Sequence, residues 1–140
     1  MSDLLNCLVT YEFELSDAAA NPTTPALIPP SALPDAGDIS GFVMLKAGAV
    51  TGITAQCPNA SGDSVTVTIY KNNAQMDGVS VQTTNAAPNG YAIFGKDQSS
   101  GALQFAAGDV ITVKYLTATG GAYTVKDLLV ELIVQYGLSE

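Results

Sequence analysis

Apolar and polar residues alternate with a period of two along much of this chain, and residues 110–115 (VITVKY) show the pattern clearly. Side chains of an extended strand point alternately to its two sides. The set predicted to face a core is Ile111, Val113 and Tyr115, and the set predicted to face outward is Val110, Thr112 and Lys114. Just before this run, Gly108 can adopt a positive φ and Asp109 can accept hydrogen bonds from nearby backbone N–H groups, so a tight turn is predicted there.

The same alternation recurs at short intervals along the chain. Residues 5–15 carry apolar side chains at every odd position, and residues 64–73 (SVTVTIYKNN) pass from alternation into a turn at Asn72 and Asn73. Further strands are predicted at 41–48, 50–58, 78–83 and 91–94. Short strands separated by turns every eight to twelve residues or so are typical of an all-β sandwich or barrel.

The last periodic run, residues 123–136, has leucines at helical spacing but favours a strand. It is rich in β-branched residues, which suit a pleated sheet better than a helix. Its alternating apolar set is Val130, Leu132, Val134 and Tyr136, with Glu131 and Gln135 between them. We therefore predict a terminal strand.

Residues 16–38 differ in kind, because they hold five of the seven prolines and show little periodicity. Proline removes a backbone donor and favours polyproline II or loop conformations, and connections this long are often functional. One interpretation is an extended arm laid over a neighbouring subunit. Its candidate partner-contact residues are Leu27, Ile28 and Leu33. The other interpretation is a long loop packed on its own domain.

Charged residues are few, and acidic residues outnumber basic ones. Charged residues make up 13% of the chain, against ~25% in ordinary soluble domains, and the net charge is −8. The chain has five lysines and no arginine, so nucleic-acid binding is not expected, because phosphate neutralisation needs clustered Lys and Arg. A neutral, amide-rich surface suits extensive contact with other protein, and it equally suits a rigid extracellular-type β domain.

Catalytic equipment is not expected either. The chain contains no histidine, which rules out a Ser-His-Asp or Cys-His site within it. A carboxylate pair is the remaining option, and its candidates are Glu12, Glu14, Asp38, Asp109, Asp127 and Glu131. Each of these has a plainer role at a strand surface or turn. We predict no enzyme activity and no cofactor.

Metal and phosphate sites are not predicted. Two loose oxygen clusters, Asn59 with Ser61 and Asp63, and Asp35 with Asp38, match no calcium-loop motif, and no phosphate-binding glycine motif occurs.

The length of 140 residues suits one domain over residues 1–140, with 16–38 as its proline-rich loop or arm. No secretory signal and no membrane-spanning apolar run is recognised, so we expect synthesis in a cytoplasm and no membrane contact. Cys7 and Cys57 lack metal-ligand spacing, and a bridge between them is possible but unsupported.

Four stretches carry a family resemblance. They are VMLKAGAVTGI at 43–53, VTVTIYKNN at 65–73, FAAGDVITVKY at 105–115 and the terminal alternating strand. Their order resembles small phage virion jelly rolls and, more distantly, the trimeric C1q/TNF-like jelly roll. The resemblance covers about two thirds of the chain and implies an antiparallel jelly-roll β-sandwich of about eight strands.

The same resemblance implies a function. It points to a capsid decoration, or cement, protein that binds the outer surface of a phage capsid, with the major capsid protein as partner and a homotrimer as the expected oligomer. The alternative is a tail-fibre head that binds host-surface glycan, and a host-side C1q-like binding module comes third. A fibre head usually follows a stalk or attachment segment, whereas the first strand is predicted near residue 5, which favours decoration.

Overall fold

The computed structural model describes residues 8–17, 26–28, 30, 41–57, 64–84, 89–94, 103–117 and 126–137. Those residues form ten strands and no helix. The strands are β1 (Leu8–Asp17), β2 (Ala26–Leu27), β3 (Gly41–Val43), β4 (Gly48–Gln56), β5 (Ser64–Lys71), β6 (Ala74–Thr84), β7 (Asn89–Ile93), β8 (Gln104–Phe105), β9 (Val110–Thr117) and β10 (Lys126–Tyr136).

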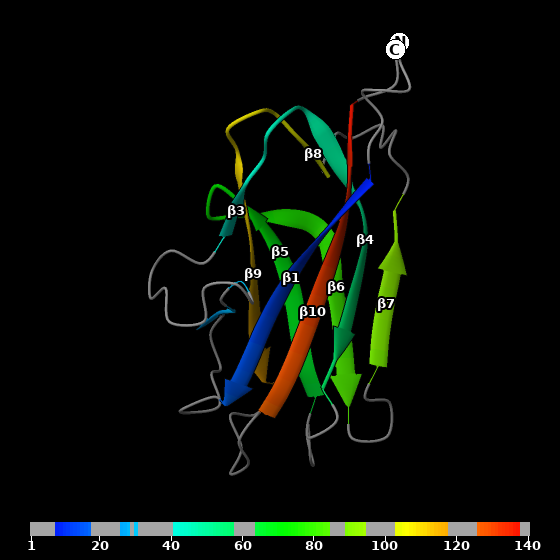
Figure 1. Cartoon of the computed structure of the whole chain (residues 1–140). Helices are drawn as coiled ribbons and strands as arrows, with labels where there is room; N and C mark the ends of the chain where they lie inside the picture. Colours follow the sequence, from blue (N-terminus) through cyan, green and yellow to red (C-terminus); the bar gives the residue numbers. More distant parts are fainter. Residues whose placement is uncertain are drawn as a thin grey trace.

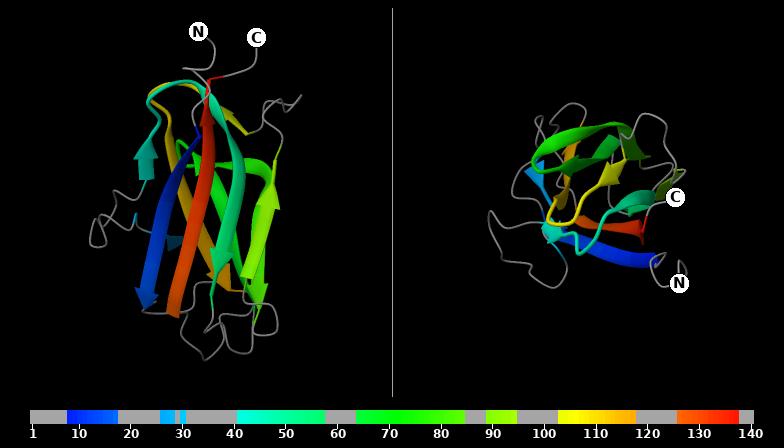
Figure 2. Two further views of the ribbon diagram at one scale, coloured as in Figure 1. Left: turned by 45° about the vertical axis from the view of Figure 1, so that its right-hand side comes forward. Right: turned by 90° about the horizontal axis from the view of Figure 1, so that it is seen from above.

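Two five-stranded antiparallel sheets pack face to face (Figure 1). Sheet A has the order β1-β10-β4-β7, with β8 pairing β4, and sheet B has the order β2-β9-β5-β6, with β3 pairing β9. The chain crosses repeatedly between the sheets, so β4, β7 and β10 lie in one sheet while β5, β6 and β9 lie in the other (Figure 2). This double Greek-key order is that of a jelly roll, as predicted.

The core lies between the sheets and follows the predicted alternation. In β9 the side chains of Ile111, Val113 and Tyr115 are buried. In β10 the predicted set is buried as well: Val130, Leu132, Val134 and Tyr136. One face of each strand is therefore apolar because it packs on the opposite sheet. The prediction of strands at 110–115 and at the end of the chain is confirmed.

Asn72 and Asn73 form the predicted turn between β5 and β6. Their φ angles are 50° and 68°, so both central residues adopt the left-handed region that a type I′ hairpin turn requires. Asparagine tolerates this region better than most residues. Gly108, in the turn before β9, has the predicted positive φ of 90°.

The described part of the proline-rich segment contains a short strand, which the sequence analysis missed. Ala26 and Leu27 pair with β9, the Ile28 backbone N–H donates to the Val113 carbonyl at 3.0 Å, and Pro30 forms an isolated bridge with Phe13 of β1. The described residues of this segment therefore contact both sheets of their own chain.

Candidate interaction surfaces

The three predicted contact residues differ in burial and in whether the structure describes them. Ile28 is fully buried in the core of its own chain, so its side chain is not offered to a partner. Leu27 is half-buried and lies opposite Lys114 in the register of β2 and β9. Leu33 lies outside the described residues.

The candidate catalytic carboxylates do not form a site where the structure describes them. Glu12 and Glu131 are cross-strand partners on the outer face of sheet A, and the Thr54 hydroxyl donates to Glu131 Oε1 at 3.4 Å. Glu14 is exposed on the same face. Asp38 and the side chain of Asp127 lie outside the described part. Within that part, no three His, Cys, Asp or Glu residues are grouped to hold a metal ion. The two loose oxygen clusters of the sequence analysis also fall outside it.

Asp109 has a structural role. Its Oδ2 accepts the Ala106 backbone N–H at 2.8 Å, and its Oδ1 accepts the Asn72 side-chain amide at 2.9 Å. The side-chain oxygen of Asn72, Oδ1, in turn accepts the Val110 backbone N–H at 2.9 Å. The Ala106 N–H, followed by the Asn72 amide, lowers the pKa of Asp109 because both bonds favour the charged form. Asp109 thus ties the turn before β9 to the β5–β6 turn.

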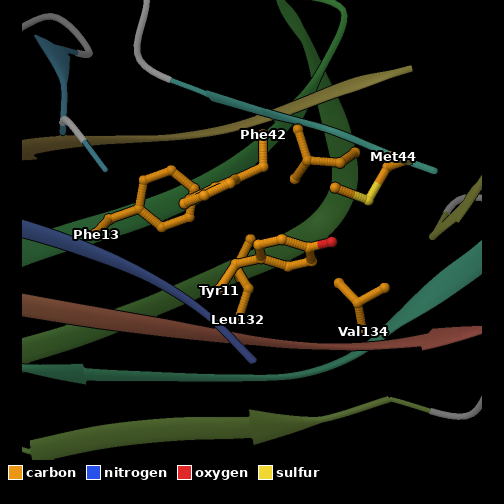
Figure 3. Close-up of a pocket in the computed structure, with 7 residues that line it drawn as sticks. Tyr11, Phe13, Phe42, Met44, Leu132 and Val134 are labelled. Atoms are coloured by element: carbon orange, nitrogen blue, oxygen red, sulfur yellow. The ribbon is translucent and has the colours of Figure 1, made fainter. Parts of the chain in front are cut away.

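An aromatic crevice lies where β1 and β3 approach each other between the sheets (Figure 3). The centroid of the Phe42 ring lies 4.6 Å from that of the Tyr11 ring and 5.2 Å from that of the Phe13 ring, and Phe42 meets Phe13 edge to face. At the end of the crevice, the Tyr136 hydroxyl bonds with that of Tyr11 and donates to Met44 Sδ at 3.7 Å. The side chains leave no room for a water-sized molecule, so the crevice is packed core and not a binding site.

The outer face of sheet A carries an exposed apolar surface on β7. Ile93 is 82% exposed and Tyr91 is 75% exposed, and Gly52 of β4 is the cross-strand partner of Ile93. Because Gly52 has no side chain, a groove of about 310 Å³ opens between these residues and Ile133 of β10. We call Gly52, Tyr91, Ile93 and Ile133 the β7 patch.

The backbone of β7 adds to this surface. The Phe94 N–H donates to the Thr51 carbonyl at 2.8 Å, so the even-numbered residues of this segment direct their backbone groups toward β4. By the alternation of an antiparallel ladder, Tyr91 and Ile93 direct theirs to the opposite edge. No described strand pairs with that edge. The described residues of β7 hold no charge and no proline, the usual devices that protect an edge strand.

Sequence reasoning missed the β7 patch, although it predicted the strand. In YAIF every residue is apolar, so alternation cannot show which side faces out. The exposed pair is Tyr91 and Ile93, and Ala92 packs against the core. The small side chains of Gly52 and Ala92 can be read from the sequence. They indicate an exposed groove only when the register between β4 and β7 is known.

The described residues include no helix of the length and apolarity needed to cross a membrane. Cys57 is buried, and the predicted possibility of a bridge to Cys7 is untested because Cys7 lies outside the described part.

Comparisons with known proteins give structural likenesses only. No family model matches the chain, and no curated protein matches it. Among solved structures it is similar to the Eiger TNF of S. frugiperda, with 13% identity, 95% of each chain covered and a TM-score of 0.49.

Two viral structures are also similar. The capsid asymmetric unit of cyanophage Pam1 matches with 13% identity, 96% of this chain and 86% of that chain covered, and a TM-score of 0.47. A virus-like particle of the Macrobrachium rosenbergii extra small virus matches with 10% identity, 96% and 81% covered, and a TM-score of 0.43. Since these TM-scores lie below 0.5, the jelly-roll assignment rests on the strand order described above.

Proposed function

We propose that this chain is a structural virion protein, a decoration or cement protein that binds the outside of a phage capsid. In this role it contacts the major capsid protein and stabilises contacts between neighbouring capsid subunits. It is made in the host cytoplasm and becomes part of the virion exterior. The four stretches that resemble phage virion jelly rolls are the starting point, and the strand order is compatible with them.

The observation that carries the proposal is the set of large apolar side chains that this weakly charged sandwich exposes on strands of both sheets. Tyr91 and Ile93 are exposed on β7 of sheet A, and Val43 is exposed on β3 of sheet B. Large apolar side chains in such positions favour contact with protein over contact with water. The described carboxylates lie on the outer face of sheet A or, for Asp109, in the hydrogen bonds that join two turns. They do not line the groove above Gly52.

We further propose that the chain forms a homo-oligomer, with a trimer as the expected state, through the β7 patch. Closed symmetry would bury Tyr91 and Ile93 and would cover the open edge of β7. The groove above Gly52 offers space for an apolar side chain of a neighbouring copy.

The decisive experiment adds the purified protein back to capsids that lack it, at low and at high salt. Occupancy and capsid melting temperature are followed together. Particles without the protein should assemble but lose resistance to heat or osmotic shock, because a clamp stabilises the lattice in proportion to its occupancy. Binding should persist at high salt, since few charges are available to be screened.

The alternative function, a tail-fibre head that binds host glycan, has one observation in its favour. The exposed Tyr91 ring lines the groove beside the hydroxyl groups of Thr51 and Thr54, a combination of an apolar ring face and polar groups that a sugar can use. Failure to bind capsids, together with binding to host cells or their glycans, would select this alternative. Copy number separates the two as well, because decoration requires many copies per particle and a fibre requires few.

A further inference from the structure

A second exposed apolar surface runs along the outer face of sheet B. Strands β2 and β3 pair, one after the other, with the same edge of β9, so that Val43 lies opposite Val110 and Leu27 lies opposite Lys114. These residues share the outward face, because the alternate residues of β9 are buried. Leu45 follows in the bend after β3, where its backbone N–H donates to the Tyr136 hydroxyl. Val43 is 64% exposed and Leu45 is 76% exposed. We call Leu27, Val43, Leu45 and Val110 the β3 stripe.

The backbone beneath the β3 stripe is firmly held. Met44, between the two exposed residues, is buried, and its N–H donates to the Asp109 carbonyl at 2.8 Å while its carbonyl accepts the Gly108 N–H at 2.8 Å. The Leu45 N–H donates to the Tyr136 hydroxyl at 3.3 Å. The side chains of Val43 and Leu45 are therefore displayed on a backbone that is already ordered, which lowers the entropy lost when a partner binds.

The charges near the β3 stripe differ in sign from those of the other sheet. Lys46 is exposed directly after Leu45, and Lys114 lies beside Leu27, where its Nζ donates to Asn73 Oδ1 at 2.8 Å. The carboxylates with described side chains are Glu12, Glu14, Asp109 and Glu131. Of these, Asp109 alone is near the stripe, and both of its oxygens already accept hydrogen bonds. Among the described side chains, the charged neighbours of the stripe are therefore two lysines and one carboxylate whose oxygens are already hydrogen-bonded.

We propose that the β3 stripe is the surface by which this protein docks on the capsid, at an apolar site of the capsid protein that is flanked by carboxylates. The inference rests on the proposed function and assigns its contact surface. The apolar anchors are Val43 and Leu45, with Leu27 at the other end of the stripe, and the lysines match the acidic flanks of the partner. Self-association through the β7 patch leaves the stripe uncovered, because the two surfaces lie on opposite sheets.

The test compares variants in the same capsid add-back assay. The double variant Val43→Ser, Leu45→Ser should lower the affinity for capsids by about tenfold or more, as expected when central apolar anchors are removed. The matched control is Leu8→Ser, because Leu8 is 66% exposed but belongs to sheet A, and its affinity should be unchanged. Circular dichroism and light scattering on each variant must show wild-type folding and oligomeric state.

A charge reversal tests the chemistry of the partner. Lys46→Glu should weaken binding several-fold at low salt and have little effect at high salt, whereas Lys46→Arg should bind like the wild type. If Lys46→Glu binds as well as the wild type at low salt, the proposed acidic flank is wrong.

The outcomes separate this inference from the function on which it rests. If the wild type binds capsids and the folded double variant binds equally well, the β3 stripe is not the docking surface although decoration stands. If the wild type does not bind at all, both fail. If the double variant binds capsids normally but loses its oligomeric state, the stripe joins copies of this chain, and the docking assignment is overturned.

Discussion

Glycines at two positions of β4 differ in how much space surrounds them. A Cβ on Gly48 would collide with the Gln135 carbonyl oxygen and lie 2.9 Å from the Tyr136 Cα, so the backbone of β10 would have to move. A Cβ on Gly52 would make only ordinary contacts, at 3.5 Å from the Ala92 carbonyl oxygen and 3.7 Å from Ile133. Gly48 is therefore required by close strand packing, and Gly52 is not.

The first prediction follows from this difference. Gly48→Ala should destabilise the domain by about 1 to 3 kcal/mol, the range for overpacking a close contact. Gly52→Ala should stabilise it by about 0.5 to 1 kcal/mol, since glycine weakens a strand interior. Denaturant melts of both variants provide the measurement. Equal effects of the two substitutions would contradict the register of β4 on β10.

The second prediction concerns pH and Asp109. Because the folded-state pKa of Asp109 lies below its ordinary value of 3.8, the carboxylate stabilises the fold above pH 3.8, and this contribution is lost as the pH falls through the lower, folded-state pKa. The melting temperature of the wild type should therefore fall more steeply below pH 4 than that of Asp109→Asn. Glu14→Gln, at an exposed strand position, is the control and should follow the wild type. Parallel curves for the wild type and Asp109→Asn would show that the bonds to Ala106 and Asn72 add no stability.

At the scale of elements, the alternation of side chains predicted those strands that pack one face on the core. It worked for β5, β9 and β10 because burial on one side forces an apolar residue at every second position. It could not find β2 or β8, which have two residues each and exist through pairing with β9 and β4. The burial of Ile28 could not be predicted either. The space between the sheets that it fills exists only after strands distant in the sequence have paired.

The pairing of β1 with β10 gives the third prediction. Glu12 and Glu131 stand directly opposite each other, and like charges in that position repel. Glu12→Gln should raise the stability at neutral pH and low salt by about 0.2 to 1 kcal/mol. The gain should shrink as salt is added, because exposed charges are screened. Glu14→Gln is the matched control, since Glu14 faces Leu129. A gain from Glu12→Gln that is independent of salt would exclude charge repulsion as its cause.

At the scale of the whole molecule, the two sheets present outer faces of different character. Sheet A combines the carboxylates of β1 and β10 with the apolar β7 patch, whereas sheet B carries the β3 stripe and its lysines. A sandwich with one face for self-association and another for a partner can do both at once. The proposed trimer and the proposed docking surface are therefore compatible, because they use different faces of the molecule.

The fourth prediction tests the β7 patch. Light scattering should give the mass of a trimer for the wild type, and its melting temperature should rise with protein concentration, because association stabilises the folded state by mass action. Tyr91→Ser with Ile93→Ser should yield a folded monomer without this dependence. A monomeric wild type at micromolar concentration would contradict the proposed oligomer.

The first and last strands described in this structure lie side by side, and Leu8 and Gln135 are register partners. A linker from the start of β1 to the end of β10 would therefore be short and would not cross the sandwich. A circular chain would be confined in its unfolded state, and the loop-entropy relation puts the resulting gain near 4 to 5 kcal/mol for a ring of this size, about 100 residues or more. Ring closure by an intein or sortase should thus raise the melting temperature of the domain above that of the linear chain and remove the ends that exopeptidases attack.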